Sequence, residues 1–323
     1  MANYRPVSNV TFLSKLVEQA VINDYLTAND LLLRHQSAYR KQHSMETAML
    51  RVLSDVLNAA DNQWVTLMGL LDLSAAFNCV EHSLLVNRLQ LNFGFVDTVL
   101  CWLTSFVTGR TQQVAYEGQL LPTTRVVFGV PQGSVLGPLL FVLYTAELSQ
   151  VVTAHGLTSH QYADDCQVYI TTSVSDASAA VNRFACCLDD VAAWMSASRL
   201  WLNPAKTVVL WLGSKYQVDR IPIQCVPVLS TSVKVANTAR DLGVTTDRSL
   251  TMSDHVAAIC RAAYFQLPQL RLFTDHRRSK VASPGIHYTS PGLLQFSVLR
   301  YLVQCLSAFA VCSECSSAGH NWH

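Results

Sequence analysis

Aspartates at the ends of hydrophobic runs constrain this chain more than any other feature of its sequence. The apolar run Val65–Leu71 ends at Asp72, and the pair Asp164-Asp165 lies between two further apolar runs. Short apolar runs bounded by polar residues predict buried strands. A carboxylate at the end of such a strand costs on the order of several kcal/mol unless it meets a cation or another partner. The sequence therefore predicts strand-end carboxylates that bind a positively charged group.

The second pair of runs predicts a β-hairpin with carboxylates at its tip. Leu157–Tyr162 and Cys166–Thr171 are apolar and alternating, and they flank Ala163-Asp164-Asp165. Three carboxylates on adjacent strand ends suit Mg²⁺, which prefers such oxygens. Two ions about 3.5–4 Å apart can promote an in-line displacement at phosphorus. Asp-Asp is also an ordinary turn dipeptide, so the spacing alone leaves a simple turn as the alternative.

The remaining pattern predicts an α+β fold with antiparallel hairpins, and it argues against a doubly wound parallel sheet. The 323 residues are 50% hydrophobic, which is enough for a large buried core. Helices are expected at Phe12–Leu26, Ser83–Leu91, Val96–Phe106, Leu136–Val151, Ala177–Ser198 and Ser253–Leu272. Further strands are expected at Thr111–Tyr116, Thr124–Phe128, Thr207–Leu212, Ile221–Val228 and Val233–Val235.

Charge and cysteine usage restrict the function only weakly. The net charge of +1 conceals −6 over residues 1–198 and +7 over residues 199–323. An acidic front and a basic back fit a metal centre joined to a segment that grips nucleic acid, and two ordinary surface patches produce the same difference. The ten cysteines show no disulfide framework and the chain opens without a signal-peptide pattern. We therefore expect an intracellular protein, in the nucleus, the cytoplasm or both, and not a secreted one.

No membrane span is expected. The longest window of lipid-like composition is Leu293–Val311, and Arg300 and Gln304 interrupt it. A spanning helix needs about 20 predominantly apolar residues.

Three strings around the aspartates carry a family resemblance. Leu70–His82 reads LLDLSAAFNCVEH, Gly129–Tyr144 reads GVPQGSVLGPLLFVLY, and His160–Tyr169 reads HQYADDCQVY. In this order they resemble motifs A, B and C of reverse transcriptases, in the form found in non-LTR (LINE-type) retrotransposons of the jockey and chicken-repeat kind. Other stretches resemble the fingers, motif D and the primer grip of that family: Asn3–Glu18, His35–Leu53, Trp194–Ser214 and Asp241–Val244.

The resemblance implies a right-hand polymerase and an RNA-directed DNA polymerase activity. Residues 1–235 would form the fingers and palm, and residues 236–272 the primer grip and the start of a thumb. Residues 273–323 do not resemble the family and are expected to be a divergent, poorly ordered tail. The partners implied are an RNA template, a DNA primer and deoxynucleoside triphosphates (dNTPs).

The resemblance also implies roles for the charged residues of the motifs. Asp72, Asp164 and Asp165 match the ligands of two Mg²⁺ ions, with Mn²⁺ as a substitute. Lys206 matches the motif D lysine, which is suited to act as a general acid toward pyrophosphate. A solvated lysine without a catalytic role is the alternative for Lys206.

Five further residues match positions that contact the nucleotide. Phe77 resembles the residue beneath the incoming sugar, where a ring excludes a 2′-hydroxyl sterically. Without the family, Phe77 would be read as a core residue. Gln132 and Gly133 precede the motif B helix, where glycine permits close backbone approach. Arg5 and Arg40 match fingers positions that could clamp the triphosphate.

Departures from the family pattern keep a second interpretation open. Asn78, Cys79 and Glu81 stand where relatives usually have Asp, Thr and Asp. The chain also looks like part of a longer retrotransposon polyprotein. A catalytically inactive relic that at most binds nucleic acid is therefore the alternative function. Another two-metal enzyme with a palm, such as a nucleotidyl cyclase, would explain the carboxylates but not the fingers and motif D strings.

Overall fold

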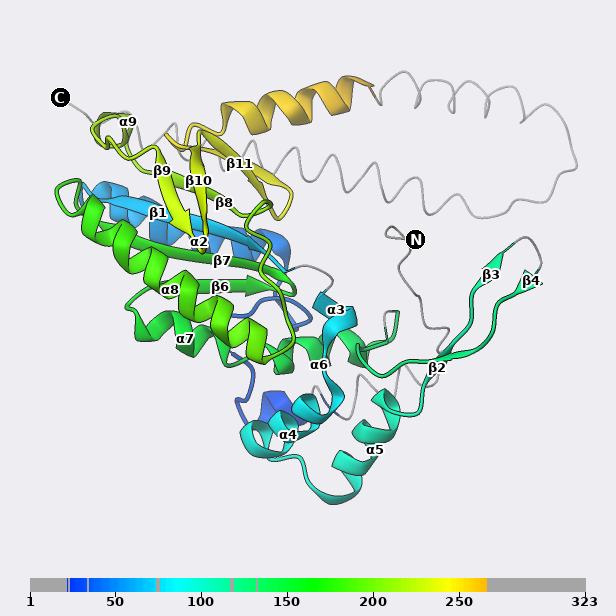
Figure 1. Ribbon diagram of the computed structural model, residues 1–323. Helices are drawn as coiled ribbons and strands as arrows, with labels where there is room; N and C mark the ends of the chain where they lie inside the picture. Colours follow the sequence, from blue (N-terminus) through cyan, green and yellow to red (C-terminus); the bar gives the residue numbers. More distant parts are fainter. Residues whose placement is uncertain are drawn as a thin grey trace, which may run out of the picture. The chain divides into compact units, whose positions relative to one another are not determined.

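A six-stranded sheet with helices on both faces forms the core of the part of the structure before residue 238 (Figure 1). The structure is a computed structural model, and it describes residues 22, 24–33, 35–73, 76–116, 119–131 and 133–265. It divides into two compact units, Met1–Asn237 and Thr238–His323. Arg5, Gln132 and the apolar window Leu293–Val311 lie outside the described residues, as does most of the helix expected at Phe12–Leu26.

The strand order is β6-β7-β1-β8-β10-β9. Every neighbouring pair is antiparallel except β8 and β10, which are parallel. This arrangement confirms the predicted α+β class. The strands are β1 (Val65–Asp72), β6 (Thr158–Tyr162), β7 (Asp165–Thr172), β8 (Val208–Leu212), β9 (Cys225–Val228) and β10 (Thr231–Ala236).

Strand β1 lies at the centre of the sheet and is almost entirely buried. Helix α8 (Ala177–Ala197) covers one face of the sheet, and α2 (Met45–Asp61) lies behind the other (Figure 1). A Cβ added at Gly69 of β1 would come within 2.6 Å of the Phe184 ring on α8. A side chain is therefore excluded from this position by the close packing of the helix on the sheet.

One expected helix is two helices in the structure. The sequence predicts a continuous helix over Leu136–Val151, but α6 (Leu136–Tyr144) and α7 (Leu148–Ala154) are separated by a turn. At this turn the Thr145 hydroxyl donates to the carbonyl of Phe141 at 3.1 Å. By length and composition alone, Leu136–Ala154 is apolar enough to cross a membrane, but 67% of that window is buried inside the fold. Such burial is typical of core helices, and one such stretch is weak evidence for a membrane span.

Among the remaining helices of the first unit, α4 packs against α5 and α6, and α3 packs against α6. The sequence interpretation missed α2, whose start is marked by a capping box between Ser44 and Thr47. Helices α4 and α5 agree with the expected helices after residue 82. The short and middle-sized helices are α3 (Ala76–Cys79), α4 (His82–Phe93), α5 (Asp97–Val107) and α9 (Lys215–Val218).

Two small ribbons replace the longer strands expected after α5. Strand β2 (Thr111–Gln112) pairs with β5 (Thr124–Arg125), and β3 (Ala115–Tyr116) pairs with β4 (Gln119–Leu120). They project away from α5 and α6 (Figure 1).

The second unit contains one two-stranded sheet and one helix among its described residues. Strand β11 (Thr238–Asp241) pairs with β12 (Val244–Asp247), and neither strand was expected from the sequence. The helix is described over 253–265 and agrees with the start of the last expected helix.

A largely buried arginine joins three helices of the first unit. Arg88 of α4 donates to the Tyr144 carbonyl and to Ser198 Oγ, both at 2.8 Å, and its Nη2 lies 3.1 Å from Glu147 Oε2. Its guanidinium also lies over the rings of Tyr144 and Trp194, at 4.7 and 4.9 Å from their centroids. Only 13% of the Arg88 side chain is exposed. The contacts tie α4 to α6 and to the end of α8.

Substituting Arg88→Met is expected to lower the free energy of unfolding by about 2–4 kcal/mol. The methionine keeps much of the apolar stem, but it removes the positive charge beside Glu147, to which, among the described residues, only Asn92 and Trp194 then donate, and it leaves the Tyr144 carbonyl without this donor. Chemical denaturation followed by circular dichroism measures the change. Arg183→Met is the matched control, because Arg183 is exposed and donates only to loop carbonyls such as that of His155. Equal losses in the two variants would contradict this prediction.

Candidate active site

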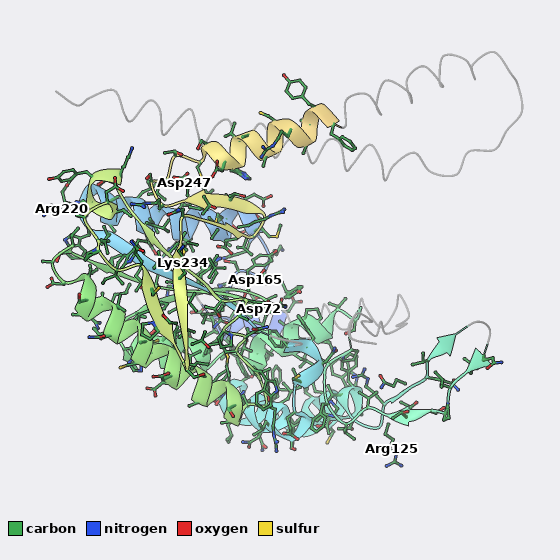
Figure 2. The ribbon with its side chains drawn as sticks, turned by 45° about the horizontal axis from the view of Figure 1, so that its top comes forward. Asp72, Arg125, Asp165, Arg220, Lys234 and Asp247 are labelled. Atoms are coloured by element: carbon green, nitrogen blue, oxygen red, sulfur yellow. The ribbon has the colours of Figure 1, made fainter. Side chains whose placement is uncertain are left out.

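Two of the three predicted metal ligands lie directly opposite each other on adjacent strands of the sheet. Asp72, the last residue of β1, is the Cα partner of Asp165, the first residue of β7. Tyr162 of β6 pairs with Asp165 in turn, so Ala163 and Asp164 form the two-residue turn between β6 and β7. Figure 2 shows Asp72 and Asp165 beside each other at this end of the sheet. The register therefore places the three aspartates at one end of the sheet, as the strand-end pattern predicted.

The environment of Asp72 fits a cation. Its Oδ2 atom is buried and accepts no hydrogen bond, although 40% of the whole side chain is exposed. A buried carboxylate oxygen without a donor is costly, and a hard divalent ion would satisfy it. Within the described residues no three Asp, Glu, His or Cys side chains converge closely enough to form a ready-made metal cluster. The fit therefore depends on the donor chemistry and the facing positions of Asp72 and Asp165, with Asp164 next in the chain.

Lys206 is the cation that approaches this site in the structure. Its Nζ lies 3.4 Å from Asp72 Oδ2, close enough for charge attraction although no hydrogen bond forms. The turn before β8 sets this position: the Asn203 N–H donates to the Asp72 carbonyl at 3.2 Å. The Asn203 carbonyl then accepts from the N–H groups of Lys206 and Thr207. The predicted motif D lysine therefore lies beside a predicted metal ligand.

Substituting Lys206→Met is expected to tighten the binding of Mn²⁺ alone by about two- to fivefold. Lys206 is 64% exposed, and an exposed ion pair contributes on the order of 0–1 kcal/mol. Its removal frees Asp72 from a competing cation. Titration with Mn²⁺, with the free ion followed by electron paramagnetic resonance, measures the affinity. Lys215→Met on α9 serves as the control for a general loss of positive charge. Unchanged or weaker binding in Lys206→Met would contradict the assignment of Asp72 as a ligand.

A buried glutamine supports the turn that carries Asp164. The Oε1 atom of Gln36 accepts hydrogen bonds from the N–H groups of Ala38 at 2.9 Å and Ala163 at 3.3 Å. Ala163 has φ +58°, a left-handed conformation that is uncommon for alanine. Gln36 also forms a parallel bridge with Gln161 of β6. The sequence interpretation missed Gln36, since nothing in the order of residues links it to a turn 127 positions away.

The residues after Gln36 bring part of the expected fingers segment to the same turn. Burial raises the pKa of the Tyr39 hydroxyl, and the negative charge of Asp164 raises it further. Tyr39 is half exposed and was not predicted as a site residue. Arg40, the predicted triphosphate clamp, donates from Nη1 to the Leu33 carbonyl at 3.1 Å. Its role toward the nucleotide stays a prediction.

A histidine on β6 makes the free energy of unfolding depend on pH. Burial lowers the pKa of His160 to about 4, and the positive charges of His35 and Arg51 act in the same direction. The unfolded chain binds a proton near pH 6.5, so between pH 6.5 and about 4 the unfolded state holds more protons than the folded state. We expect the free energy of unfolding to fall as pH drops through this window, with a slope approaching about 1.4 kcal/mol per pH unit.

Denaturant titrations at a series of pH values between 4 and 7 measure the slope contributed by His160. His160→Gln removes the titrating group, and Gln can still hydrogen-bond to Ser37 Oγ, which lies 3.1 Å from the His160 Nε2 atom. The variant should therefore show a shallower decline than the wild type. Parallel curves for the two proteins would refute the prediction.

Motif B packs directly against motif A. The ring of Phe77 on α3 lies against Phe141 on α6, with centroids 4.5 Å apart and planes inclined by 33°. Ser134 Oγ donates to the Pro131 carbonyl at 2.7 Å and accepts from the Gly137 N–H at 2.9 Å, which closes the loop into α6. This packing fixes the position of Phe77, which lies on α3, the short helix that follows Asp72 in the chain.

The glycine predicted to contact the nucleotide lies on the surface of this loop. Gly133 is exposed and has φ +90°, a conformation that favours glycine. Its neighbour Gln132 lies outside the described residues. The contact of Gly133 with a nucleotide stays a prediction.

One departure from the family pattern has a local structural role. Glu81 caps α4: its Oε2 accepts from the Leu84 N–H at 2.6 Å, and its Oε1 accepts from Ser83 Oγ. Burial acts to raise the pKa of Glu81, but these hydrogen bonds outweigh it and hold the pKa below its usual value. A carboxylate one carbon longer than the Asp usual at this position therefore serves as an N-cap.

Comparison with known proteins agrees with this arrangement. The family described as reverse transcriptase (RNA-dependent DNA polymerase) matches residues 1–245. The probable RNA-directed DNA polymerase from transposon BS of Drosophila melanogaster is 29% identical over 285 residues, which are 85% of this chain and 31% of that protein. The RNA-directed DNA polymerase from mobile element jockey of the same species is 27% identical over 270 residues, 80% of this chain and 28% of that protein.

Among solved structures, apo telomerase from Candida tropicalis, truncated from its C-terminal domain, is similar in fold. Its TM-score is 0.52 at 14% sequence identity, over 75% of this chain and 45% of that chain. At this identity the likeness supports the fold alone.

An antiparallel-dominated sheet with carboxylates at one edge and helices on both faces is the palm of a right-hand polymerase. The chain belongs to the reverse transcriptase (RNA-dependent DNA polymerase) family, and its relatives place it among the LINE-type members. It spans about a third of the length of the curated relatives it matches.

Proposed function

We propose that this chain is an RNA-directed DNA polymerase that transfers nucleotides from dNTPs to the 3′-hydroxyl of a DNA primer on an RNA template. The observation that carries the proposal is the pairing of Asp72 with Asp165 beside Asp164, with a buried, hydrogen-bond-free oxygen on Asp72. Membership of the family supports it, since reverse transcriptases use divalent metal ions and copy an RNA template.

The proposed reaction forms one P–O bond and breaks another. The primer 3′-hydroxyl loses its proton and attacks the α-phosphorus of the dNTP, and pyrophosphate leaves. Asp72, Asp164 and Asp165 would hold two Mg²⁺ ions, or Mn²⁺ in their place. Such ions, when bound, lower the pKa of the attacking hydroxyl and neutralise charge on the leaving group.

The chain's own side chains would supply the proton transfer and the choice of sugar. Lys206, close to Asp72 and 64% exposed, is free to turn toward the leaving pyrophosphate and protonate it. Phe77, held against Phe141, would exclude a 2′-hydroxyl from the incoming sugar. Arg5 and Arg40 would contact the triphosphate, and Gln132 and Gly133 the nucleotide or template.

The alternative is a relic that binds nucleic acid without catalysis. Asn78 and Cys79 favour it, because they stand next to Phe77 where relatives usually carry Asp and Thr. Asn78 removes a negative charge that relatives usually carry just after Phe77. We propose an intracellular location for either function, in the nucleus, the cytoplasm or both, on the basis of the cysteine pattern.

Incorporation of dTTP on poly(rA)/oligo(dT) with Mg²⁺ distinguishes the two functions. The wild type is compared with the double variant Asp164→Ala, Asp165→Ala, and binding of the same substrate is measured by fluorescence anisotropy. Incorporation by the wild type and its loss in the variant, with substrate binding retained, would establish the polymerase. Binding without incorporation by folded wild-type protein would favour the relic.

A further inference from the structure

The peptide of Gly129 joins motif B to the segment that carries Phe77. The Gly129 N–H donates to the Val80 carbonyl at 2.7 Å, and the next N–H, that of Val130, donates to the Phe77 carbonyl at 2.9 Å. Glu81 and Phe128 form an antiparallel bridge just outside these bonds. The backbone from Phe77 to Glu81 is therefore fastened to the backbone from 128 to 130.

Gly129 also lacks room for a side chain. Its φ is +85°, and an added Cβ would lie 2.9 Å from the Asn78 Cα and 3.0 Å from the carbonyl oxygens of Asn78 and Phe77. These are backbone atoms of α3, which cannot turn aside as the end of a flexible side chain can. A methyl group at position 129 must therefore displace the backbone of Phe77 and Asn78, or its own.

Two buried or half-buried side chains hold the Gly129 carbonyl from the other direction. His82 Nε2 donates to it at 2.9 Å, and Arg110 Nη1 donates to it at 3.2 Å. The carbonyl, the N–H and the missing Cβ of Gly129 thus all define one position for the peptide. The Phe77 carbonyl accepts a hydrogen bond from Val130, the residue after Gly129. The position of the Phe77 backbone relative to α6 therefore depends on the position of the Gly129 peptide.

We propose that Gly129 is a positioning residue for sugar discrimination, which acts by fixing the backbone beneath Phe77. The inference rests on the proposed polymerase function and on Phe77 as the residue that excludes a 2′-hydroxyl. Steric exclusion of one hydroxyl depends on contacts of a few tenths of an ångström, because repulsion rises steeply at close approach. Loosening the Phe77 backbone should therefore admit ribonucleotides before it abolishes polymerisation.

The test is the ratio of kcat/KM for dTTP to that for UTP on poly(rA)/oligo(dT). Gly129→Ala is expected to lower this ratio about tenfold or more. Gly109→Ala is the matched control: Gly109 has φ +68°, but nothing lies within 4 Å of its added Cβ. The control carries similar backbone strain without the contact, so its ratio should equal that of the wild type. An equal fall in both variants would overturn the proposal, because strain alone would explain it.

A double-mutant cycle tests whether Gly129 acts through Phe77. Phe77→Val removes the ring, and adding Gly129→Ala to it should cause no further fall in the ratio. An additional fall as large as the one that Gly129→Ala causes in the wild-type background would overturn the proposal.

A second variant decides the matter if Gly129→Ala does not fold. Arg110→Met removes one donor to the Gly129 carbonyl and adds no atom near Phe77, and we expect it to lower the ratio about two- to fivefold, as loss of one hydrogen bond allows. An unchanged ratio in folded Arg110→Met protein would refute the proposal in that case.

A wild type that incorporates neither nucleotide would overturn the polymerase function itself, and this inference with it. An active wild type with an unchanged ratio in active Gly129→Ala would overturn only this inference.

Discussion

Substituting Asp72→Ala is expected to reduce the rate of primer extension at least about 10³-fold without loss of the fold. Each tenfold loss of rate corresponds to about 1.4 kcal/mol, and a metal ion at a reacting phosphate supplies several kcal/mol. Asp72 is paired with Asp165 in the register of β1 and β7. It is the one acidic residue of β1, so no other carboxylate on this strand can replace it. The measurement is single-turnover extension of a labelled primer on an RNA template.

The free energy of unfolding of Asp72→Ala should stay near that of the wild type or rise slightly. The wild-type chain holds an Asp72 oxygen that is buried without a hydrogen bond, and alanine removes this cost. Asp61→Ala, at the exposed end of α2, is the control and should keep full activity. Extension by Asp72→Ala at a rate within tenfold of the wild type would exclude Asp72 as a metal ligand.

Phe77→Val is expected to raise the incorporation of ribonucleotides relative to deoxyribonucleotides by about 10- to 100-fold. The valine is too short to reach the place of the phenyl ring, so a 2′-hydroxyl no longer meets it, and discrimination by a single steric contact falls in this range. Competition between UTP and dTTP in primer extension measures the ratio, and the total rate with dTTP should fall far less.

The ring of Phe77 also packs against Phe141, so a change in stability must be separated from a change in specificity. Arg88→Met is the control, because its contacts lie at Tyr144, Ser198 and Glu147 and not at the Phe77 ring. It should lower the free energy of unfolding without a comparable change in the nucleotide ratio. If Phe77→Val discriminates as well as the wild type, the sugar is excluded by another residue.

The placement of the three aspartates at strand ends could be predicted from the sequence because its signals are local. An apolar run that ends at Asp72 and two apolar runs around Asp164 and Asp165 each predict a strand end, and the register then aligns them. Fold class follows from the same local patterns. The motif strings further predicted Lys206 near the site, and its Nζ lies 3.4 Å from Asp72.

Contacts between distant segments could not be predicted, because no local pattern encodes them. The hydrogen bond from Ala163 to Gln36 joins positions 127 residues apart. Gly129 of motif B packs against the Asn78 backbone of motif A only because it has no side chain. Helix α2 was overlooked because its polar start obscured the buried face that packs on β1. The break between α6 and α7 was missed because both helices are apolar across it, so hydrophobicity shows no boundary.

The most direct test of the proposed site is to locate Mn²⁺ by anomalous diffraction in crystals of the chain with an RNA template, a DNA primer and a non-hydrolysable dTTP analogue. We expect two anomalous peaks about 3.5–4 Å apart, bound by the carboxylates of Asp72, Asp164 and Asp165 and by phosphate oxygens. A bound analogue without metal at these carboxylates, or metal held only elsewhere, would contradict the assignment of this sheet edge as the polymerase centre.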